Sequence, residues 1–596
     1  MQRSKKTNSL DAQRHSLAHI LAAVVLEKFP SGKLGIGPTI ENGFYYDFQL
    51  PKNLAPEDLK DLEKEMRRLA RMNLVFSGKK TTPLAAKKAF AKQPFKLDLI
   101  KEFVKEKKAL TIYDTIDKRT GKVYFSDLCK GGHVKNTSEI NADAFRLTKV
   151  AGAYWRGDEK NPQLQRVYGI AFQDKKELEE YLRLQEEAKK RDHRKLGKEL
   201  GLFTISDEVG PGLPLFYPKG AILRRIVENY ITDLQEKRGY MPIWIPHITK
   251  GELYKISGHL DKYDAMYPPM DLKGEAKYYL KPMNCPHFMM LYKSLKHSYR
   301  DLPVRYVSTT TNYRYEKSGE LSGLTRVRSL TQDDCHVFTT PDQIESEINL
   351  MLDMIAEVYK TFGFNDFWVR ISTHDPKNKE KYIGDPKIWK KSETALTKLI
   401  KSRGWKYDIG IGEAAFYGPK LDFIFKDVLG REWQLSTIQL DMNLPKRFEL
   451  EYIDRKGAKL QPVVIHRAIL GSTERFLGIL IEHFAGNFPL WLAPVQVKVL
   501  AVSDKHNDYA RKVYKTLAEA GMRAEMAPSD ETLGKRIREA EMQRIPYIAV
   551  VGDEEMNKGT VNIRTHGNQP SQGVNSERRV VDFIEDLKQE VKKFIL

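Results

Sequence analysis

The segment "RVRSLTQDDCHVF", from Arg326 to Phe338, contains two arginines, two aspartates, a cysteine and a histidine. Side chains of a β-strand alternate between its two faces. As a strand, the segment would place on one face Arg326, Arg328, Gln332, Asp334 and His336. Asp333 and Cys335 would face the other way, so Cys335 and His336 cannot easily share a metal ion. A cysteine that joins His336 at a metal must then be Cys129 or Cys285.

Arginines also converge just before this segment. In "NYRYEKSGELSGLT", Arg314 and Glu316 share a strand face, and a glycine-containing loop returns to Arg326, which predicts a hairpin. The planar guanidinium matches phosphate oxygens, so Arg314 and Arg326 are candidates for holding a nucleotide. Arginine–glutamate pairing on an exposed sheet explains the same residues equally well.

A third arginine lies at the start of a predicted helix in "HRAILGSTERFLGIL". Ser472 is a typical N-cap residue, and Glu474 and Arg475 fall in the first turn. A cation is poorly placed at this end of the helix dipole. The placement favours an arginine that is kept for an anionic ligand.

Histidines recur near the N-terminus. "HSLAH" places His15 and His19 on one helix face, and "SDLCKGGH" adds Cys129 and His133. By spacing alone these residues look like a zinc site. The segment lacks the glutamate of the H-E-x-x-H helix, which argues against a metalloprotease.

Several domains must position these residues, because 596 residues with 41% hydrophobic content have room for several cores. Residues 1–175 mix short strand-like and helical segments, which indicates an α+β domain. A highly charged helical connector follows at 176–198, and a strand-rich region at 199–490. Residues 494–596 alternate strands and helices, which predicts a small, mostly parallel α/β sheet.

Composition narrows the class of protein. A formal charge of +20 favours a polyanionic partner, although a merely basic surface is as plausible. Three cysteines without a close pair argue against a disulfide framework. No apolar segment is long enough for a membrane span, and the N-terminus has no apolar core of a signal peptide. We therefore expect a cytoplasmic protein without a membrane partner.

A helix and a strand ending in proline, an R-x-E hairpin and a G-S-x-E-R helix resemble the three signature motifs of class II aminoacyl-tRNA synthetases. More narrowly, the chain resembles threonyl-tRNA synthetases in "KPMNCPH", "TQDDCH", "AAFYGPKLDF", "WQLSTIQLDMNLP" and "HRAILGSTERF". The resemblance covers nearly the whole chain. It implies a multidomain α+β and α/β fold with an editing domain (1–175), a helical linker (176–198), an antiparallel catalytic core (199–490) and an anticodon-binding domain (494–596). Many bacterial members begin with a further ubiquitin-like domain, which we expect this chain to lack.

The resemblance implies a threonine–tRNA ligase that uses ATP and magnesium to activate L-threonine and transfers it to tRNA(Thr). Arg314, Arg326 and Arg475 would be the catalytic residues. ATP would be bound by Arg314, Glu316, Arg326, Gln434, Thr437 and Arg475. Threonine would be bound by Gln332, Asp334, Tyr417, Lys420 and Gln439.

The family binds one zinc ion per subunit through a cysteine and two histidines, which match Cys285, His336 and His466. Such a set with an open position suits a zinc ion that also binds substrate. Coordination of the threonine hydroxyl would exclude valine, which a shaped apolar pocket distinguishes poorly.

Serine also carries the hydroxyl, so a second, hydrolytic site is the expected remedy. The resemblance implies that this editing site acts on seryl-tRNA(Thr) without a required metal. It assigns to the site the residues His15, His19, Lys96, Asp127, Cys129 and His133. Glu555 and Arg564 match positions that contact the anticodon. The helix with Lys535, Arg536 and Arg538 would offer phosphate contacts, or simply a solvated charged face.

Class II cores usually form homodimers through the first motif. The candidate interface here is the strand-like "YMPIWIPHI" and the preceding helical stripe of Ile222, Leu223, Ile226, Val227, Tyr230, Ile231 and Leu234, which ends at Gly239. Burial within one subunit explains the stripe nearly as well.

Two positions depart from the family pattern: Leu330 replaces an aromatic residue that stacks on adenine, and Ser436 replaces a glycine. An alternative function is a synthetase-like protein that binds tRNA or messenger RNA without catalysis. A free-standing hydrolase of mischarged tRNA would need only the first 175 residues or so. The retained arginines and zinc ligands argue against the first alternative, and the intact large domain argues against the second.

Overall fold

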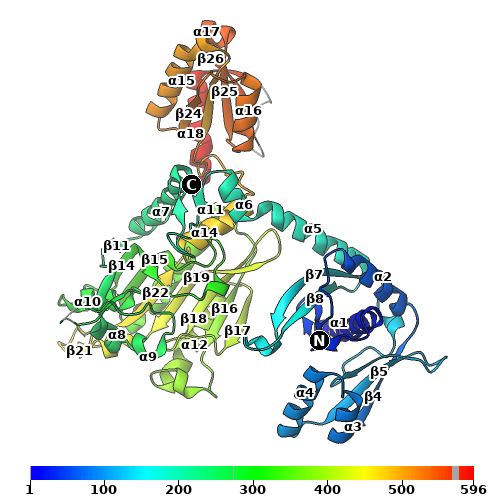
Figure 1. The fold of residues 1–596 in the computed structure, drawn as a ribbon. Coiled ribbons are helices and arrows are strands. Elements are labelled where there is room, and N and C mark those ends of the chain that lie inside the picture. The colour runs from blue at the N-terminus through cyan, green and yellow to red at the C-terminus, as the bar shows by residue number, and fades with distance from the viewer. Residues whose placement is uncertain (1, 273, 275, 567–575, 596) are drawn as a thin grey trace. The chain divides into compact units, whose positions relative to one another are not determined.

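The computed structural model describes residues 2–272, 274, 276–566 and 576–595. Two compact units make up the chain, residues 1–186 and 187–596 (Figure 1). Helix α5 (Lys175–Arg191) contains the boundary between them. Among the described residues, no helix is long and apolar enough to cross a membrane.

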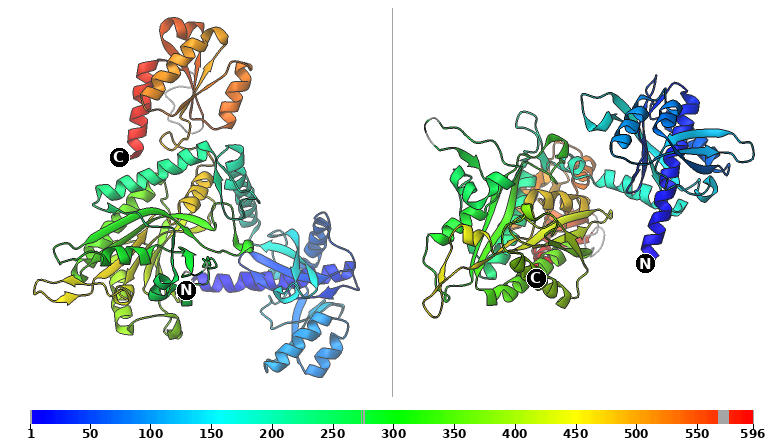
Figure 2. Two further views of the ribbon diagram at one scale, coloured as in Figure 1. Left: turned by 60° about the vertical axis from the view of Figure 1, so that its left-hand side comes forward. Right: turned by 90° about the horizontal axis from the view of Figure 1, so that it is seen from below.

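The first unit has the predicted α+β architecture. Its elements are α1 (Gln2–Lys28), β1 (Lys33–Leu34), β2 (Thr39–Ile40), β3 (Gly43–Gln49), α2 (Asp58–Ala70), β4 (Val75–Thr81), α3 (Pro83–Ala89), α4 (Pro94–Lys105), β5 (Leu110–Ile116), β6 (Val123–Leu128), β7 (Phe145–Tyr154) and β8 (Gln163–Ala171). One sheet has the order β1-β3-β8-β7, with β2 beside β3, and a second has the order β4-β5-β6. The long helix α1, dark blue in Figure 2, contacts both sheets and α2. Residues 16–25 of α1 are all buried, because neighbours cover the helix on every side.

The second unit is organised around an eight-stranded sheet of order β11-β14-β15-β22-β19-β18-β16-β17, antiparallel except for its two end pairs. Its first elements are α6 (His193–Glu199), β9 (Phe203–Thr204), β10 (Leu215–Phe216), α7 (Pro218–Lys237), β11 (Met241–Pro242), β12 (Ile248–Lys250), α8 (Gly251–Ser257), α9 (His259–Lys262), β13 (Tyr278–Leu280), α10 (Cys285–Lys293), β14 (Val304–Tyr313) and β15 (Ser329–Thr339). The remaining elements around this sheet are α11 (Ile344–Phe362), β16 (Phe367–Thr373), α12 (Pro386–Ser402), β17 (Tyr407–Ile411), β18 (Lys420–Lys426), β19 (Glu432–Asp441), α13 (Leu444–Arg447), β20 (Tyr452–Ile453), β21 (Lys459–Leu460), β22 (Val463–Ala468) and α14 (Thr473–His483).

Successive side chains of β15 face the apolar core and the cavity in turn. Cys335 and Val337 join the apolar core with residues of α7, α11 and α14, and Asp333 is fully buried in an ion pair with Arg467 at 3.2 Å. Gln332 and Asp334 line a cavity on the opposite face. The predicted alternation of residues 332–336 is therefore confirmed.

The same prediction was wrong for Arg326 and Arg328. Strand β15 begins only at Ser329, and the chain from 314 to 328 forms a loop that includes a short 3₁₀ turn at Ser318–Glu320. The cross-strand ladder ends with the hydrogen bond from the Arg314 N–H to the Arg328 carbonyl, and beyond it the loop makes short-range bonds such as those between Ser322 and Arg326. Strand alternation therefore does not set the directions of these two side chains.

The helical stripe of α7 is buried within the subunit. Leu223, Val227, Ile231 and Leu234 belong to its core, and Gly239 follows with the predicted left-handed conformation at φ 81°. The segment after the helix is different, because Trp244 is 80% exposed. Intrasubunit packing thus accounts for the stripe but not for this exposed apolar segment.

The C-terminal part of the second unit contains β23 (Val497–Ala501), α15 (Asn507–Glu519), β24 (Ala524–Ala527), α16 (Leu533–Met542), β25 (Tyr547–Val551), α17 (Asp553–Lys558), β26 (Thr560–Thr565), β27 (Ser576–Arg579) and α18 (Val580–Ile595). Its sheet has the order β24-β23-β25-β26-β27. The first three strands are parallel, as predicted, whereas β26 and β27 join antiparallel. The alternation of strands and helices along the chain did not indicate β26 and β27, because the direction of a strand is set by the hydrogen bonds that it makes with its neighbours in the sheet.

Candidate active sites

A cavity of about 330 Å³ lies over the middle of the eight-stranded sheet. It is lined by residues from β15, β18, β19 and β22, from the 314–328 loop and the loop before β18, and from the starts of α10 and α14. They include the predicted ATP and threonine residues Arg314, Glu316, Arg326, Gln332, Asp334, Tyr417, Lys420, Gln434, Thr437, Gln439 and Arg475. The fold therefore brings all of these positions, widely separated in the sequence, to one place.

Cys285, His336 and His466 form a buried cluster beside this cavity. Their potential ligand atoms lie within 4.8 Å of one another. His336 and His466 are directly opposite each other on β15 and β22, and Cys285 begins α10. The sheet register thus joins two histidines that are 130 positions apart.

The polar atoms of this cluster fit a metal ion. Neither ring nitrogen of His336 has a hydrogen-bond partner, although the residue is fully buried, and Nδ1 of His466 also lacks one. The other nitrogen of His466, Nε2, lies 2.9 Å from Asp441 Oδ2. Such a carboxylate contact orients a metal-binding imidazole. Buried orphan nitrogens are costly without a ligand, which is the chemistry expected of a cation site.

Next to the cluster, polar side chains are held in place by neighbours. Asn284 donates to Asp334 at 2.9 Å, and Asn312 donates to Gln332 at 2.8 Å. Burial raises the pKa of Asp334 and outweighs the opposing hydrogen bond from Asn284. Both asparagines were missed in the sequence, although Asn284 lies inside the quoted "KPMNCPH" motif.

Three arginines converge at the other end of the cavity. Arg475 donates through Nε to the carbonyl of Thr325 at 3.0 Å and through a terminal nitrogen to the carbonyl of Gln434 at 3.2 Å. Burial lowers the pKa of Arg475, and the charges of Arg314 and Arg326 lower it further. Clustered like charges of this kind favour a polyanionic ligand. Ser472 caps α14 by accepting from the Arg475 N–H at 3.2 Å, as predicted.

Arg326 also makes the pairing that the sequence left open. Its guanidinium contacts Glu316 at 2.8 Å and Glu320 at 2.7 Å. The side chain of Arg326 is 46% exposed, so these pairs contribute little to stability. They leave the arginine at the mouth of the cavity, where it can exchange partners.

Asp422 is a buried centre that sequence reasoning did not identify. It accepts hydrogen bonds from Lys420 at 2.6 Å, from Gln434 at 2.7 Å and from Thr437 at 3.1 Å. The residue is fully buried on β18. The available signal in the sequence was the motif "GPKLDF", in which Asp422 follows Lys420 by two residues and so shares its strand face. Asp422 therefore orients three cavity residues at once.

The two departures from the family pattern are accommodated differently. Ser436 is fully buried, and its hydroxyl bonds Tyr359 at 3.0 Å and the carbonyl of Ile469. Leu330 lines the cavity without a polar role.

We expect Leu330→Phe to lower the KM for ATP about fivefold, because a ring adds stacking on the adenine that leucine cannot supply. ATP titration in pyrophosphate exchange measures it. Leu330→Met is the volume-matched control and is expected to leave the KM for ATP unchanged. Equal effects of both substitutions would show that adenine does not lie against this position.

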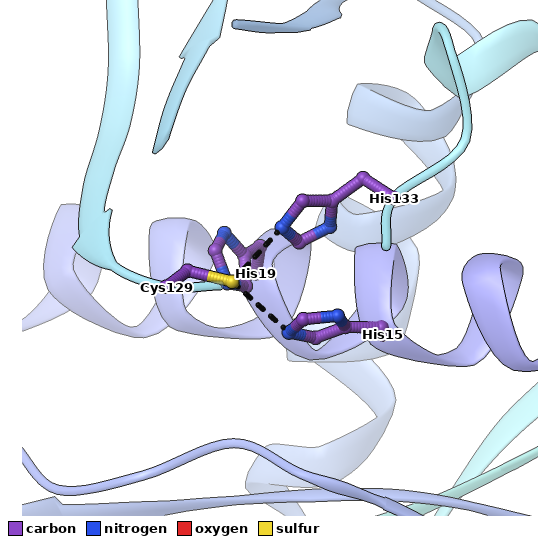
Figure 3. A group of neighbouring side chains, drawn as sticks. All are labelled: His15, His19, Cys129 and His133. Carbon is purple, nitrogen blue, oxygen red and sulfur yellow. Dashed lines mark hydrogen bonds between the residues drawn. The ribbon is translucent and has the colours of Figure 1, made fainter. Parts of the chain in front are cut away.

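A second polar cluster occupies the first unit (Figure 3). Cys129 Sγ lies 3.4 Å from His15 Nε2 and 3.3 Å from His133 Nε2, and His19 joins them with its ligand atom within 4.8 Å. His15 and His19 come from one face of α1, and Cys129 follows β6, so the predicted grouping of these four residues is present. Burial raises the pKa of the Cys129 thiol to about 11 and lowers the pKa of His133 to about 2.

Lys96 and Asp127 complete this second site. Lys96 Nζ contacts Asp127 Oδ1 at 2.5 Å, and both side chains are almost fully buried. Asp127 Oδ2 accepts from Tyr46 at 2.6 Å and lies 3.8 Å from His19 Nε2. A cavity of about 440 Å³ is lined by His15, His19, Lys96, Asp127 and Cys129. Tyr46 was missed because a tyrosine in an apolar strand resembles a core residue.

In the C-terminal domain, the predicted anticodon residues differ in their surroundings. Arg564 lies exposed on β26, whereas Glu555 accepts from the Gly552 N–H at 2.8 Å and so caps α17. On α16, Lys535 pairs with Glu531 at 2.6 Å. Arg536 is buried and donates to the Glu531 carbonyl, so it does not belong to an exposed phosphate-binding face.

Comparisons with protein families match three parts of the chain. Residues 270–484 match the tRNA synthetase class II core domain (G, H, P, S and T), 496–589 the anticodon binding domain, and 110–168 the threonyl and alanyl tRNA synthetase second additional domain. The fold and the central cavity are thus those of a class II aminoacyl-tRNA synthetase.

Curated relatives narrow this class. The threonine–tRNA ligase of Gloeobacter violaceus is 51% identical over 94% of this chain and 90% of its own, and that of Thermus thermophilus is 49% identical over 92% and 84%. A solved structure titled as the RNA binding domain of threonyl-tRNA synthetase from Cryptosporidium parvum aligns with a TM-score of 0.63 and 35% identity, covering 67% of this chain and 98% of the other. The chain belongs to the threonine–tRNA ligase family.

Proposed function

We propose that this enzyme activates L-threonine with ATP, transfers it to tRNA(Thr), and hydrolyses mischarged seryl-tRNA(Thr). The observation that carries the proposal is the central cavity, which has a Cys-His-His cluster at one end and three convergent arginines at the other. One end suits an amino acid, and the other suits a triphosphate. The alternative of a non-catalytic RNA-binding protein has no support in the comparisons.

For activation, the arginines bind and align ATP. Arg314 contacts the α-phosphate, Arg326 and Arg475 hold the distal phosphates, and Glu316 contacts the adenine. Gln434 and Thr437, oriented by Asp422, face the ribose. The threonine carboxylate attacks the α-phosphate, so the chain contributes alignment and charge stabilisation rather than a nucleophile. Magnesium accompanies the phosphates.

For selection, Cys285, His336 and His466 would hold one zinc ion per subunit. Bound there, zinc would supply a Lewis acid for the threonine amino group and hydroxyl, and valine has no hydroxyl to offer it. Asp334 binds the amino group, with Gln332 beside it. Tyr417, Lys420 and Gln439 line the rest of the amino-acid pocket.

For editing, residues of the first unit bind and hydrolyse the seryl ester. The buried Lys96–Asp127 pair fixes charges next to His19, and His15, Cys129 and His133 form the adjoining wall. These groups orient the ester and a water molecule and move protons between them. No metal is required in this proposal.

We further propose the remaining partners and boundaries. The editing domain covers residues 1–175, the linker 176–198, the catalytic core 199–490 and the anticodon-binding domain 494–596. In the last of these, Glu555 and Arg564 contact the anticodon. The enzyme acts as a cytoplasmic homodimer, with the exposed segment around Trp244 as its candidate interface.

The test is ATP–pyrophosphate exchange by purified protein of measured zinc content, with threonine, serine and valine supplied separately. We expect strong exchange with threonine, weaker exchange with serine and almost none with valine. Exchange needs no tRNA, so it isolates activation. Absence of exchange with all three amino acids in folded, zinc-loaded protein would contradict the proposal.

A further inference from the structure

His193 is a buried histidine that none of the roles above uses. It begins α6, whose N-cap is Asp192, and lies between the helix α14 and the loop of residues 314–328. Its ring contacts two partners in these different elements. His193 therefore links the chain that follows the connector helix to two of the elements that line the ATP end of the cavity.

The two contacts define which ring nitrogen carries the proton. His193 Nε2 accepts from the backbone N–H of Leu324 at 3.0 Å, because an amide N–H can only donate. Nδ1 then carries the proton and donates to Glu482 Oε1 at 2.6 Å. Glu482 is held in turn by Arg431. The imidazole is thus neutral and oriented by both sides.

The loop packs tightly against His193 at Gly323. Gly323 has φ +48°, and a Cβ there would lie 2.2 Å from His193 Nε2. Leu324 is fully buried next to α14. The following residue, Thr325, offers its carbonyl to Arg475 Nε at 3.0 Å, and both line the cavity. Only one peptide unit therefore lies between the Leu324 N–H that His193 binds and the Thr325 carbonyl that binds Arg475.

A metal site is a poor explanation for Asp192, His193 and Glu482, although their ligand atoms are close. Asp192 Oδ1 accepts from the Arg194 N–H at 2.8 Å. His193 Nε2 is occupied by Leu324, and Glu482 is neutralised by Arg431. All three groups thus have protein partners, unlike the orphan nitrogens of His336.

We propose that His193 is a positioning residue for ATP: it fixes the Gly323–Thr325 turn and thereby orients Arg475 toward the phosphates. The inference rests on the proposed function of the cavity. In this role His193 does not itself contact the substrate. We expect its effect to be specific to ATP, because Thr325, the residue of this turn that lines the cavity, contacts Arg475 at the ATP end.

The test compares two amides at this position by ATP–pyrophosphate exchange in the full-length enzyme. In His193→Gln, the longer side chain places an acceptor near the former Nε2 and keeps the Leu324 bond. In His193→Asn, the amide replaces Nδ1, keeps the Glu482 bond and loses the Leu324 bond. We expect His193→Asn to raise the KM for ATP about threefold to tenfold, with the KM for threonine unchanged, and His193→Gln to stay within about twofold of the parent.

Equal behaviour of the two variants, or a parallel change in both KM values, would overturn the inference in favour of a purely structural histidine. The parent enzyme's own exchange reports separately on the proposed function. Should His193→Asn not fold, Gly323→Ala displaces the same turn and must give the same selective rise in the KM for ATP. An unchanged KM for ATP in folded Gly323→Ala would also overturn the inference.

Discussion

Cys285→Ser is expected to remove bound zinc and to lower threonine activation by at least about 100-fold, while seryl-tRNA hydrolysis continues. Loss of a residue that merely supports a ligand costs 10- to 100-fold in comparable metal sites, so loss of a ligand should cost at least as much. Serine is a poor zinc ligand near neutral pH, because its hydroxyl stays protonated. Zinc content by atomic absorption and threonine-dependent exchange measure the two effects.

Cys335→Ser is the matched control for this prediction. Cys335 is also buried and precedes the ligand His336, but it faces the opposite side of β15, in the apolar core. The same chemical change there should leave the zinc content at that of the parent. Full zinc content in Cys285→Ser would refute the ligand assignment, whatever happened to activity.

Much of the catalytic site follows from local patterns plus resemblance. Alternation alone separated Asp334 and His336 from Cys335, and the structure agrees. Alternation could not select Cys285 or His466, because strand register brings His466 opposite His336, and the start of helix α10 brings Cys285 to both. The metal cluster was therefore predictable only through the family pattern.

Residues that support the site were harder to predict. Asp422 and Asp441 look like ordinary strand residues, and their importance comes from the cross-strand partners that they meet. His193 lies in a highly charged helical segment, where a histidine is expected on a solvated face. It is buried because α14 and the 314–328 loop cover it. Such tertiary contacts leave no periodic signal in the sequence.

At the level of the fold, the errors have a common cause. The strand expected from Arg326 starts three residues later, because the loop before it bonds to itself. The C-terminal sheet gains the antiparallel strands β26 and β27, which follow a short helix and return on the sheet edge. Element type was readable from hydrophobic spacing, whereas boundaries and strand direction depended on nonlocal hydrogen bonds.

His19→Ala is expected to lower the hydrolysis of seryl-tRNA(Thr) by about 10²- to 10⁴-fold, the usual contribution of a positioned proton-transfer group. His19 is nearly fully buried, lies 3.8 Å from Asp127 and packs against His133. Threonine activation should not change, because the site belongs to the other compact unit. Deacylation of preformed seryl-tRNA and charging with threonine, measured on the same preparation, check both parts.

Two lysine variants distinguish a loss of editing chemistry from general damage to the first unit. Lys96→Met removes the buried ammonium that contacts Asp127 at 2.5 Å, whereas Lys92→Met changes an exposed lysine four residues earlier, in the turn before α4. We expect seryl-tRNA to accumulate only with Lys96→Met, because an uncompensated Asp127 can no longer hold His19 and Tyr46 in place. Normal deacylation by both Lys96→Met and His19→Ala would refute the editing site. Loss of deacylation in Lys92→Met as well would mean that the assay reports stability of the unit rather than its chemistry.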